Sequence, residues 1–387
     1  MSTNDQRPAA EAHAAQRNEL GRAQRIVVKV GSAMLTDPEN GLATAKIAEY
    51  CAQLHGLKEA GREVVLVSSG AVAEGCKRLG WSQRPDTIHQ LQAAAAVGQM
   101  GLAQAYEAAL SSHGRATAMV MLTHDDLADR ERYLNARATL AQLLELGVVP
   151  VINENDTVAT DEIRFGDNDT LAALVANLLA ADLLIILTDV EGLMDADPRE
   201  EPRAQRIASA RAADNALDAS VGTGMGMLGR GGMVTKLRAA RLAARSGAHT
   251  IIASGNAEQI ITRACAGDDV GTLLVADMTP MTARKRWIAG QLRARGDLVI
   301  DSGAAAAIRE RGVSLLAVGV RRVTGRFNRG EVVRLVDLEG GVIAQGLSNY
   351  GSEDIGKLIG VKSEDFAQHI TYVGEPELVH RDNLVLV

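Results

Sequence analysis

The sequence predicts an α/β protein: a three-layer sandwich around a mostly parallel sheet, followed by a small β-rich domain. Strand-like and helix-like segments alternate from residue 25 to about residue 255. Such alternation is typical of a parallel sheet with helices on both faces. After about residue 277 the pattern changes to short strand-like segments separated by Gly and Asp. We therefore expect two structured domains of different architecture.

The expected strands of the first domain are nearly continuous apolar runs, as strands covered on both faces require. They are residues 25–30, 63–68, 115–122, 148–152, 183–188 and 249–254. Helical patterns between them cover 43–60, 88–112, 133–146, 169–180 and 233–246. A glycine directly follows four of these patterns, where a helix C-cap favours a residue that tolerates positive φ. These glycines are Gly61, Gly114, Gly147 and Gly247.

The expected domain boundaries follow from composition. Residues 1–24 are Ala-rich with balanced charges and lack the apolar stretch of a signal peptide, so we interpret them as a disordered tail. The sandwich is expected over 25–262 and the β-rich domain over 277–387, with strands at 297–300, 314–318, 321–325, 331–337 and 341–346. This second domain has a basic half, with eleven Lys/Arg against three Asp/Glu over 281–330. Its other half is acidic, with four against ten over 331–387.

Charge and cysteine content restrict the function classes. The 387-residue chain has a net charge of −7, which argues against a nucleic-acid-binding surface along the whole chain. No apolar run reaches the roughly 18 residues of a membrane span. The three cysteines lack metal-ligand spacing and suit a reducing cytoplasm. We expect a soluble cytoplasmic enzyme.

The segment over 148–170 carries the strongest functional signal. The apolar run VVPVI opens directly into a loop dense in acids and amides, NENDTVATDEIRFGDND. Unpaired carboxylates are too costly to bury, and ligands of open α/β sheets bind beyond the carboxyl ends of the strands. This segment therefore predicts a binding site for a small polar substrate that carries an amine.

Two further strand ends have features of anion binding. The first strand places Lys29 near its end and Gly31 in the following turn, where glycine allows close approach of backbone N–H groups to phosphate oxygens. The second strand ends in Ser68–Gly70, which opens a helix whose first amides have no intrahelical partner. Each motif alone is also compatible with a purely structural role.

Two later motifs fit the margin of a nucleotide site. Thr188 and Asp189 come at the end of the strand over 183–188 and open a polar loop. A glycine-rich stretch over 222–232 then leads into a helix that carries Lys236 one turn from its start. Lys236 is thus placed to reach a transferring phosphate.

In this order, VVKVGS, VSSGAVAEG, VPVINENDTVAT with GDND, LTDVEGL and GGMVTK resemble the glutamate 5-kinases of the amino-acid-kinase family. The C-terminal region resembles a PUA domain. The resemblance implies the amino-acid-kinase fold and an ATP-dependent phosphorylation of the γ-carboxylate of L-glutamate, giving L-glutamyl 5-phosphate. This reaction is the first step of proline biosynthesis, and the resemblance also implies feedback inhibition by proline.

The resemblance assigns roles to individual residues. The positions that match glutamate-binding residues are Ser69, Asp156 and Asn168, with Asp156 as the partner of the α-ammonium. Lys29 and Lys236 would supply catalytic cations, and Asp189 would hold them. The ATP-binding positions would be Lys29, Thr188, Asp189, Arg230, Gly231, Gly232, Met233, Val234, Thr235 and Lys236. Arg230 departs from the family pattern, which often has Thr or Ser there.

The residue chemistry agrees with this reaction. A side-chain carboxylate is already ionised at neutral pH and needs no general base, whereas the moving phosphoryl group needs cations and in-line positioning. Mg²⁺ is expected to bridge the ATP phosphates, with Asp167 and Asp169 as candidate ligands. The implied partners are glutamate, ATP, proline, glutamyl-phosphate reductase and further copies of the chain in a dimer or tetramer.

Two alternatives stay open on the sequence. The first is that the chain is a kinase of another acidic amino acid or of carbamate. The second is that it is an RNA-binding or RNA-modifying protein built around the PUA-like region. The basic half of that region favours RNA, but the region lacks interleaved aromatic residues and the chain is acidic overall. We expect the PUA-like region to regulate or oligomerise the protein rather than to bind RNA.

Overall fold

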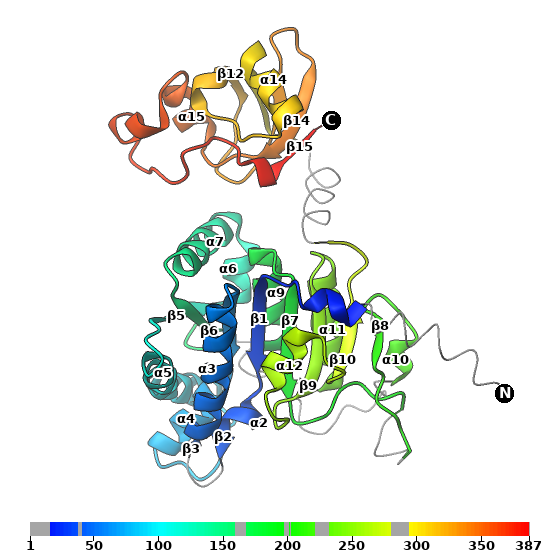
Figure 1. Ribbon diagram of the computed structural model, residues 1–387. Helices are drawn as coiled ribbons and strands as arrows, with labels where there is room; N and C mark the ends of the chain where they lie inside the picture. Colours follow the sequence, from blue (N-terminus) through cyan, green and yellow to red (C-terminus); the bar gives the residue numbers. More distant parts are fainter. Residues whose placement is uncertain are drawn as a thin grey trace, which may run out of the picture. The chain divides into compact units, whose positions relative to one another are not determined.

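The computed structural model describes residues 16–37, 41–158, 168–196, 201, 203–220, 232–279 and 294–386. Its internal contacts divide the chain into two compact units, Met1–Pro280 and Met281–Val387 (Figure 1). No helix in these ranges is long and apolar enough to cross a membrane.

An eight-stranded sheet forms the centre of the first unit. Neighbouring strands are parallel except for the pair β9 and β10, which is antiparallel. The mostly parallel sheet predicted from the sequence is therefore confirmed. The order is β5 (Thr117–Leu122), β6 (Val149–Glu154), β4 (Glu63–Ser68), β1 (Arg25–Val30), β7 (Leu183–Thr188), β9 (His249–Ser254), β10 (Thr272–Val275) and β8 (Ser209–Arg211).

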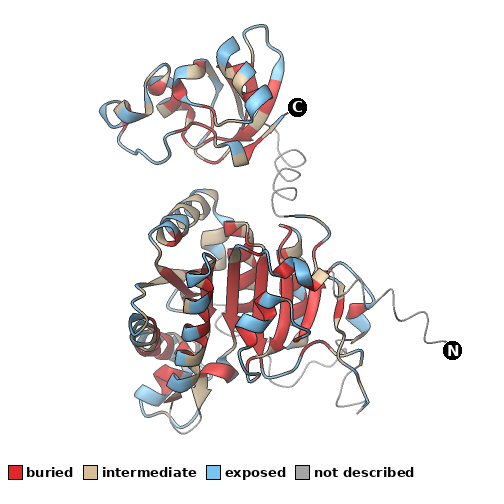
Figure 2. Cartoon of the chain, viewed as in Figure 1, coloured by how far each residue is buried: buried red, intermediate tan, exposed pale blue. Residues whose placement is uncertain are grey.

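Helices cover both faces of this sheet and explain its apolar runs. In β1, Ile26 and Val28 belong to one core cluster and Val27 to the other, and all three are fully buried. Figure 2 shows the central strands of the sheet as mostly buried. Because both faces of the strand are buried, every position favours an apolar residue. One cluster includes α3 (Thr44–Glu59), α5 (Ile88–Ser111) and α12 (Ile260–Ala266), and the other includes α7 (Arg130–Glu145), α9 (Asn168–Leu179) and α11 (Met233–Ala244).

Shorter elements join these layers. The helices α2 (Ser32–Leu35), α4 (Ala71–Arg78), α6 (His124–Ala128) and α10 (Leu217–Ser220) are each eight residues or fewer. The strands β2 (Thr36–Asp37) and β3 (Gly41–Leu42) form a small antiparallel pair. The four glycines predicted to follow helices have positive φ values between 68° and 86°, as a C-cap requires.

The helices α4 and α5 pack with their backbones in close contact at two glycines. A Cβ atom on Gly75 would lie 1.7 Å from the carbonyl oxygen of Ala94, and one on Gly98 would lie 1.8 Å from that of Ala71. Either substitution would force the helices apart. Glycine at these two positions therefore fixes the distance between the two helices.

The prediction of a disordered tail over residues 1–24 is wrong for residues 16–24. Residues 1–15 lie outside the described ranges. Residues 16–20 are helical, and Leu20 and Ala23 are buried. The Arg17 guanidinium is also buried and donates to the backbone carbonyls of four residues: Ala208, Asp268, Val270 and Gly271. The Ala-rich, charge-balanced composition does not predict the contacts of Arg17, because the carbonyl groups that it binds lie near the other end of the unit's sequence.

The predicted end of the first domain at residue 262 is too early. Strand β10 lies beyond it and pairs with both β9 and β8 inside the main sheet. The apolar run of β10 is only four residues long, too short to stand out in the sequence.

The second unit contains a five-stranded mixed sheet with its own apolar core. The run over 314–318, predicted as a strand, instead leads into a short 3₁₀ helix, and only Leu315 forms a bridge, to Val379. Two helices, α14 (Ser302–Arg311) and α15 (Ser352–Leu358), pack in this unit. The strand order is β12 (Val320–Gly325), β11 (Gly296–Ile300), β13 (Val332–Val336), β14 (Val342–Leu347) and β15 (Leu384–Leu386).

Candidate functional site

The carboxyl ends of the central strands bring the predicted motifs to one edge of the main sheet. Val30, at the end of β1, lies in register with Ser68 at the end of β4 and with Leu187 near the end of β7. In β6, Ile152 is in register with Val67 of β4, so the acidic loop starts at the same level. This is the edge at which open α/β sheets bind ligands.

A buried carboxylate joins the two predicted catalytic lysines. The Nζ atom of Lys29 lies 2.7 Å from Oδ1 of Asp169, and the Nζ atom of Lys236 lies 3.1 Å from Oδ2. All three side chains are at most 6 % exposed. Lys29 comes from β1, Asp169 from the first turn of α9 and Lys236 from the first turn of α11. Two cations from opposite ends of the unit's sequence thus meet on one anion.

The electrostatics of this cluster differ from those of isolated side chains. Burial by itself would raise the pKa of Asp169, but the ammonium groups of Lys29 and Lys236 outweigh it and lower the pKa to about 2. Burial lowers the pKa of Lys236, and the ammonium of Lys29 adds to this effect while Asp169 opposes it. The cluster therefore places one carboxylate between two lysine side chains in a mostly dry environment.

The start of α11 completes the cluster. The hydroxyl of Thr235 lies 2.8 Å from both Oδ2 of Asp169 and the backbone carbonyl of Gly232. Gly232 is the N-cap of the helix, so Lys236 lies about one turn in, as the sequence predicted. Met233 is half-buried and Val234 is 57 % exposed. Of the predicted ATP-binding stretch, Arg230 and Gly231 lie outside the described residues.

A second polar network surrounds Asn168, the residue before Asp169. Its amide nitrogen lies 2.8 Å from the carbonyl oxygen of Ser68, and 3.0 Å from both Oγ of Ser69 and Oδ1 of Asn153. Asn153 in turn donates to Gln99 of α5. The structure therefore brings together two of the predicted substrate-binding residues, Ser69 and Asn168, next to the lysine cluster.

Other predicted residues lie nearby with different roles. Asp156 is half-buried in the turn that follows β6. Asp189 is exposed and accepts a hydrogen bond from the Thr188 hydroxyl at 3.0 Å, so Asp169, and not Asp189, pairs with both lysines. The N–H of Gly31 donates to the carbonyl of Leu187, so this N–H is already used in the turn after β1.

Of the two candidate magnesium ligands, Asp169 is paired with lysines instead. Both carboxylate oxygens of Asp169 face lysine ammonium groups, which would repel a divalent cation, and Asp167 lies outside the described residues. Over the described ranges no group of three or more His, Cys, Asp or Glu side chains is arranged to hold a metal ion. A magnesium ion that is held mainly by ATP phosphates and water fits these residues better than one in a protein cage.

Sequence reasoning underrated two residues. Asp169 was considered only as a metal ligand, although two lysines expected to converge in a buried site need a counter-charge, and GDND supplies one. Asn153 was noted only as part of the polar loop, yet it connects Asn168 and Gln99. The spacing from β6 to α9 does not show this contact, because it depends on how these two elements are placed in the tertiary structure.

Comparisons with known proteins agree with this geometry. The amino acid kinase family model matches residues 24–254, and the PUA domain model matches residues 296–370. A glutamate 5-kinase of Chromohalobacter salexigens is 59 % identical over 98 % of this chain and 100 % of its own length. One from Pseudomonas savastanoi pv. phaseolicola is 60 % identical over 94 % of this chain and 99 % of its own length.

These matches confirm the resemblance to glutamate 5-kinases and the PUA-like character of the C-terminal region. They cover both structured units, and the first family match spans the whole strand–helix alternation from β1 to β9. The chain belongs to the amino acid kinase family.

Proposed function

We propose that the protein catalyses the ATP-dependent phosphorylation of the γ-carboxylate of L-glutamate, giving L-glutamyl 5-phosphate. The observation that carries this proposal is the convergence of Lys29 and Lys236 on the buried Asp169, next to the Ser69–Asn168 contact. The near-full-length identity to glutamate 5-kinases supports the choice of substrate.

The chemistry follows from the charges of the site. The γ-carboxylate is the nucleophile and is already ionised, so no residue has to remove a proton from it. During transfer, negative charge is spread over the oxygens of the γ-phosphoryl group of ATP, and Lys29 and Lys236 stabilise it. Because both ammonium groups are buried, their effect on this charge is stronger than in water.

Asp169 acts as a positioning residue for the two lysines. Each of its oxygens binds one ammonium, which holds the lysines at a fixed separation before substrates bind. Its negative charge also favours the protonated form of Lys236 against the effect of burial. A cluster that is organised in advance needs no rearrangement at the moment of transfer.

The substrate would lie at the ends of β4 and β6. The hydroxyl of Ser69 offers a hydrogen bond to a carboxylate of the substrate, and the Asn168 amide oxygen and Asp156 offer acceptors to its α-ammonium group. The Asn168 amide is held by the Ser68 carbonyl and by Asn153, so its orientation is fixed. Hydroxyl, amide and carboxylate groups held in this way favour a short amino acid with two carboxylates.

ATP would bind along the start of α11 and the end of β7, where Thr188, Asp189 and the residues over 230–236 lie in the sequence. Mg²⁺ would bind together with the nucleotide and would neutralise part of the charge of its phosphates. The ammonium groups of Lys29 and Lys236 would then contact the γ-phosphate of ATP.

The same proposal places the protein in the cytoplasm, at the first step of proline biosynthesis. Proline would act as a feedback inhibitor at or near the glutamate pocket, and the product would pass to a glutamyl-phosphate reductase. The chain would function as a homodimer or homotetramer, with the PUA-like unit in a regulatory or assembly role.

A substrate screen tests this function. ADP release is measured with glutamate, aspartate, acetylglutamate and carbamate, and γ-glutamyl phosphate is trapped with hydroxylamine. We expect activity with glutamate, and a decrease of that activity when proline is titrated. A preference for another acceptor would refute the proposal, as would salt-dependent RNA binding without ATP turnover.

A further inference from the structure

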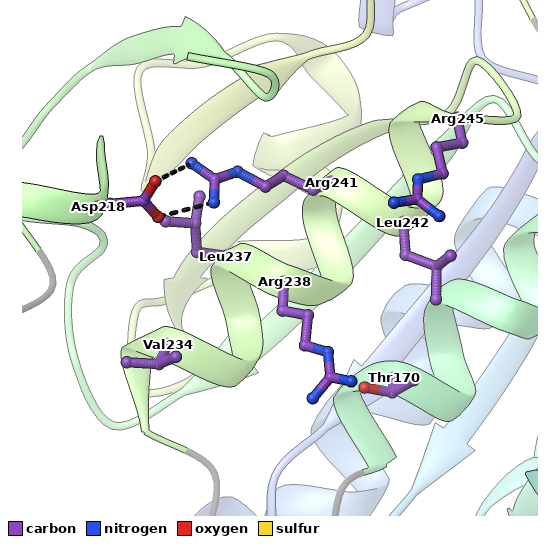
Figure 3. Close-up of a pocket in the computed structure, with 8 residues that line it drawn as sticks. All are labelled: Thr170, Asp218, Val234, Leu237, Arg238, Arg241, Leu242 and Arg245. Atoms are coloured by element: carbon purple, nitrogen blue, oxygen red, sulfur yellow. Dashed lines mark hydrogen bonds and ion pairs between the residues drawn. The ribbon is translucent and has the colours of Figure 1, made fainter. Parts of the chain in front are cut away.

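The first unit has a pocket on the outer side of α9 and α11, the two helices that carry Asp169 and Lys236. It has a volume of 520 Å³ and is lined by Thr170, Asp218, Val234, Leu237, Arg238, Arg241, Leu242 and Arg245 (Figure 3). This volume lies within the range of small-molecule sites. Most of its lining comes from one helix, α11. None of these residues belongs to the cluster around Asp169, and only Val234 is shared with the proposed ATP-binding stretch.

Three arginines follow one side of α11 in this pocket, and one of them has a structural role. Arg241 binds both carboxylate oxygens of Asp218, at 2.7 and 3.1 Å, and donates to the carbonyls of Ala212 and Asp214. These contacts attach α10 and the preceding turn to α11. Arg241 therefore forms part of the wall.

The other two arginines have unused binding capacity. Arg238 and Arg245 are exposed, and neither guanidinium has a hydrogen-bond or ion-pair partner in the part of the chain that the structure describes. Arg238 extends toward Thr170 at one end of the pocket, and Arg245 lies above Leu242 at the other (Figure 3). Seven residues separate them, which is about 10 Å along a helix.

The floor between them is apolar. Leu237 is buried, Leu242 is partly buried and packs against the core, and Val234 remains exposed at 57 %. Two unpaired guanidinium groups around such a floor suit a ligand with anionic groups and a less polar body. Guanidinium binds phosphate oxygens with two parallel hydrogen bonds, which makes phosphate the best match.

We propose that this pocket is a second anion site, separate from the catalytic one, that binds a small phosphate-bearing molecule through Arg238 and Arg245. The site shares its two helices with the catalytic cluster, because Thr170 follows Asp169 in α9 and Leu237 follows Lys236 in α11. A ligand there contacts the outer face of the helices whose inner face holds the catalytic ion pairs.

Calorimetric titration of the full chain with inorganic pyrophosphate tests the site. Mg²⁺ is kept in constant excess, and the catalytic site is first filled with glutamate and a non-hydrolysable ATP analogue. We expect one further binding event, which is at least tenfold weaker in the double variant Arg238→Ala/Arg245→Ala and weaker at high salt. The control Arg309→Ala/Arg311→Ala, which removes two exposed arginines of α14, retains it.

Inorganic phosphate and a nucleoside monophosphate, titrated under the same conditions, distinguish the sources of the anion. If the nucleotide binds at least tenfold more tightly than inorganic phosphate, its base contacts the apolar floor. If the two affinities are equal, the ligand of the site is an inorganic phosphate. The absence of binding once the catalytic site is filled overturns the proposal, and so does equal affinity in the double variant. RNA binding without pyrophosphate binding also overturns it. Unchanged turnover in the double variant shows that the catalytic site is intact. Failure of the anion-site proposal can therefore be distinguished from failure of the proposed kinase function.

Discussion

The ammonium group of Lys29 lies 2.7 Å from one carboxylate oxygen of Asp169, although 140 residues separate them in the sequence. The second oxygen of the same carboxylate lies 3.1 Å from the ammonium of Lys236. One side chain in the first turn of α9 therefore determines the spacing of both cations.

Replacing Lys236 with alanine should lower turnover by two to three orders of magnitude, about the effect of removing one group that stabilises transition-state charge. Glutamate affinity should change little, because Asn168 and Ser69 are untouched. Steady-state kinetics and calorimetry with glutamate measure the two effects. The matched control is Arg238→Ala, which removes a cation from the exposed side of the same helix and should retain turnover. Unchanged turnover in Lys236→Ala would remove that residue from the site.

The isosteric change Asp169→Asn should lower both activity and stability. It leaves two buried ammonium groups without a counter-charge, and breaking a buried ion pair in this way typically costs about 3–5 kcal/mol. Chemical denaturation of the full chain measures the loss. Adding Lys236→Met to the same variant should recover part of the stability, because one of the two unpaired charges is removed. A double variant no more stable than Asp169→Asn would contradict this account.

The activity should fall at alkaline pH below the range of an ordinary lysine. Burial lowers the pKa of Lys236 from 10.5, and the ammonium of Lys29 adds to the shift. As pH rises through this lowered pKa, Lys236 loses its charge and the cluster loses a cation. The variant Lys236→Arg keeps its charge, so its residual activity should lack this alkaline decline. Profiles of turnover against pH for both proteins give the comparison, and superimposable profiles would be evidence against the assignment.

At acid pH the same cluster affects stability. The pKa of Asp169 is lowered from 3.8 to about 2, so its ionised form stabilises the fold above about pH 4. This contribution should be lost as the pH falls from about 4 toward 2. Unfolding midpoints measured over this range should decline more steeply in the natural protein than in Asp169→Asn, which has no carboxylate to titrate there.

Asp156→Asn should chiefly weaken glutamate binding. The substitution keeps the shape of the side chain but removes the anion proposed to face the α-ammonium group. The apparent KM for glutamate should rise by tenfold or more, while that for ATP stays within about twofold. Equal losses for both substrates would indicate a folding defect, and an unchanged KM for glutamate would exclude the proposed contact.

The N-terminal segment should contribute measurably to stability. Replacing Arg17 with alanine removes the donor for four backbone carbonyls at the β8 and β10 edge. Loss of hydrogen bonds to a charged donor typically costs about 1.5–3 kcal/mol. The exposed neighbour Arg22 offers the control variant Arg22→Ala. Denaturation midpoints that do not differ between the two variants would show that the segment is not anchored.

The sequence predicted most of what local patterns encode. Four strands, including β1 and β7, have the predicted bounds, because a buried parallel strand reads as an apolar run that ends where polar residues begin. The motifs also placed Lys29, Ser69, Asn168 and Lys236 at one edge of the sheet. What local patterns do not encode is pairing at a distance. The role of Asp169 was missed for this reason.

The same limit explains the errors in domain boundaries. Arg17 and Leu20 are ordered by contacts with residues far along the chain, and no periodicity marks them beforehand. Strand β10 joins the sheet as an antiparallel neighbour of β9, outside the strand–helix alternation on which the boundary was based. In both cases tertiary contacts decide the structure and local propensity does not.

The close packing of Gly75 and Gly98 has a mechanical consequence for the substrate turn. Helix α4 begins at Ala71, directly after Ser69 and Gly70, and its backbone is in close contact with that of α5 at Gly75 and Gly98. A ligand that displaces Ser69 must therefore move α5 as well, and this helix of 24 residues extends about 36 Å. The turn at the end of β4 is thus coupled to α5. Binding of a ligand at Ser69 is expected to shift this helix along its length, as far as Ser111.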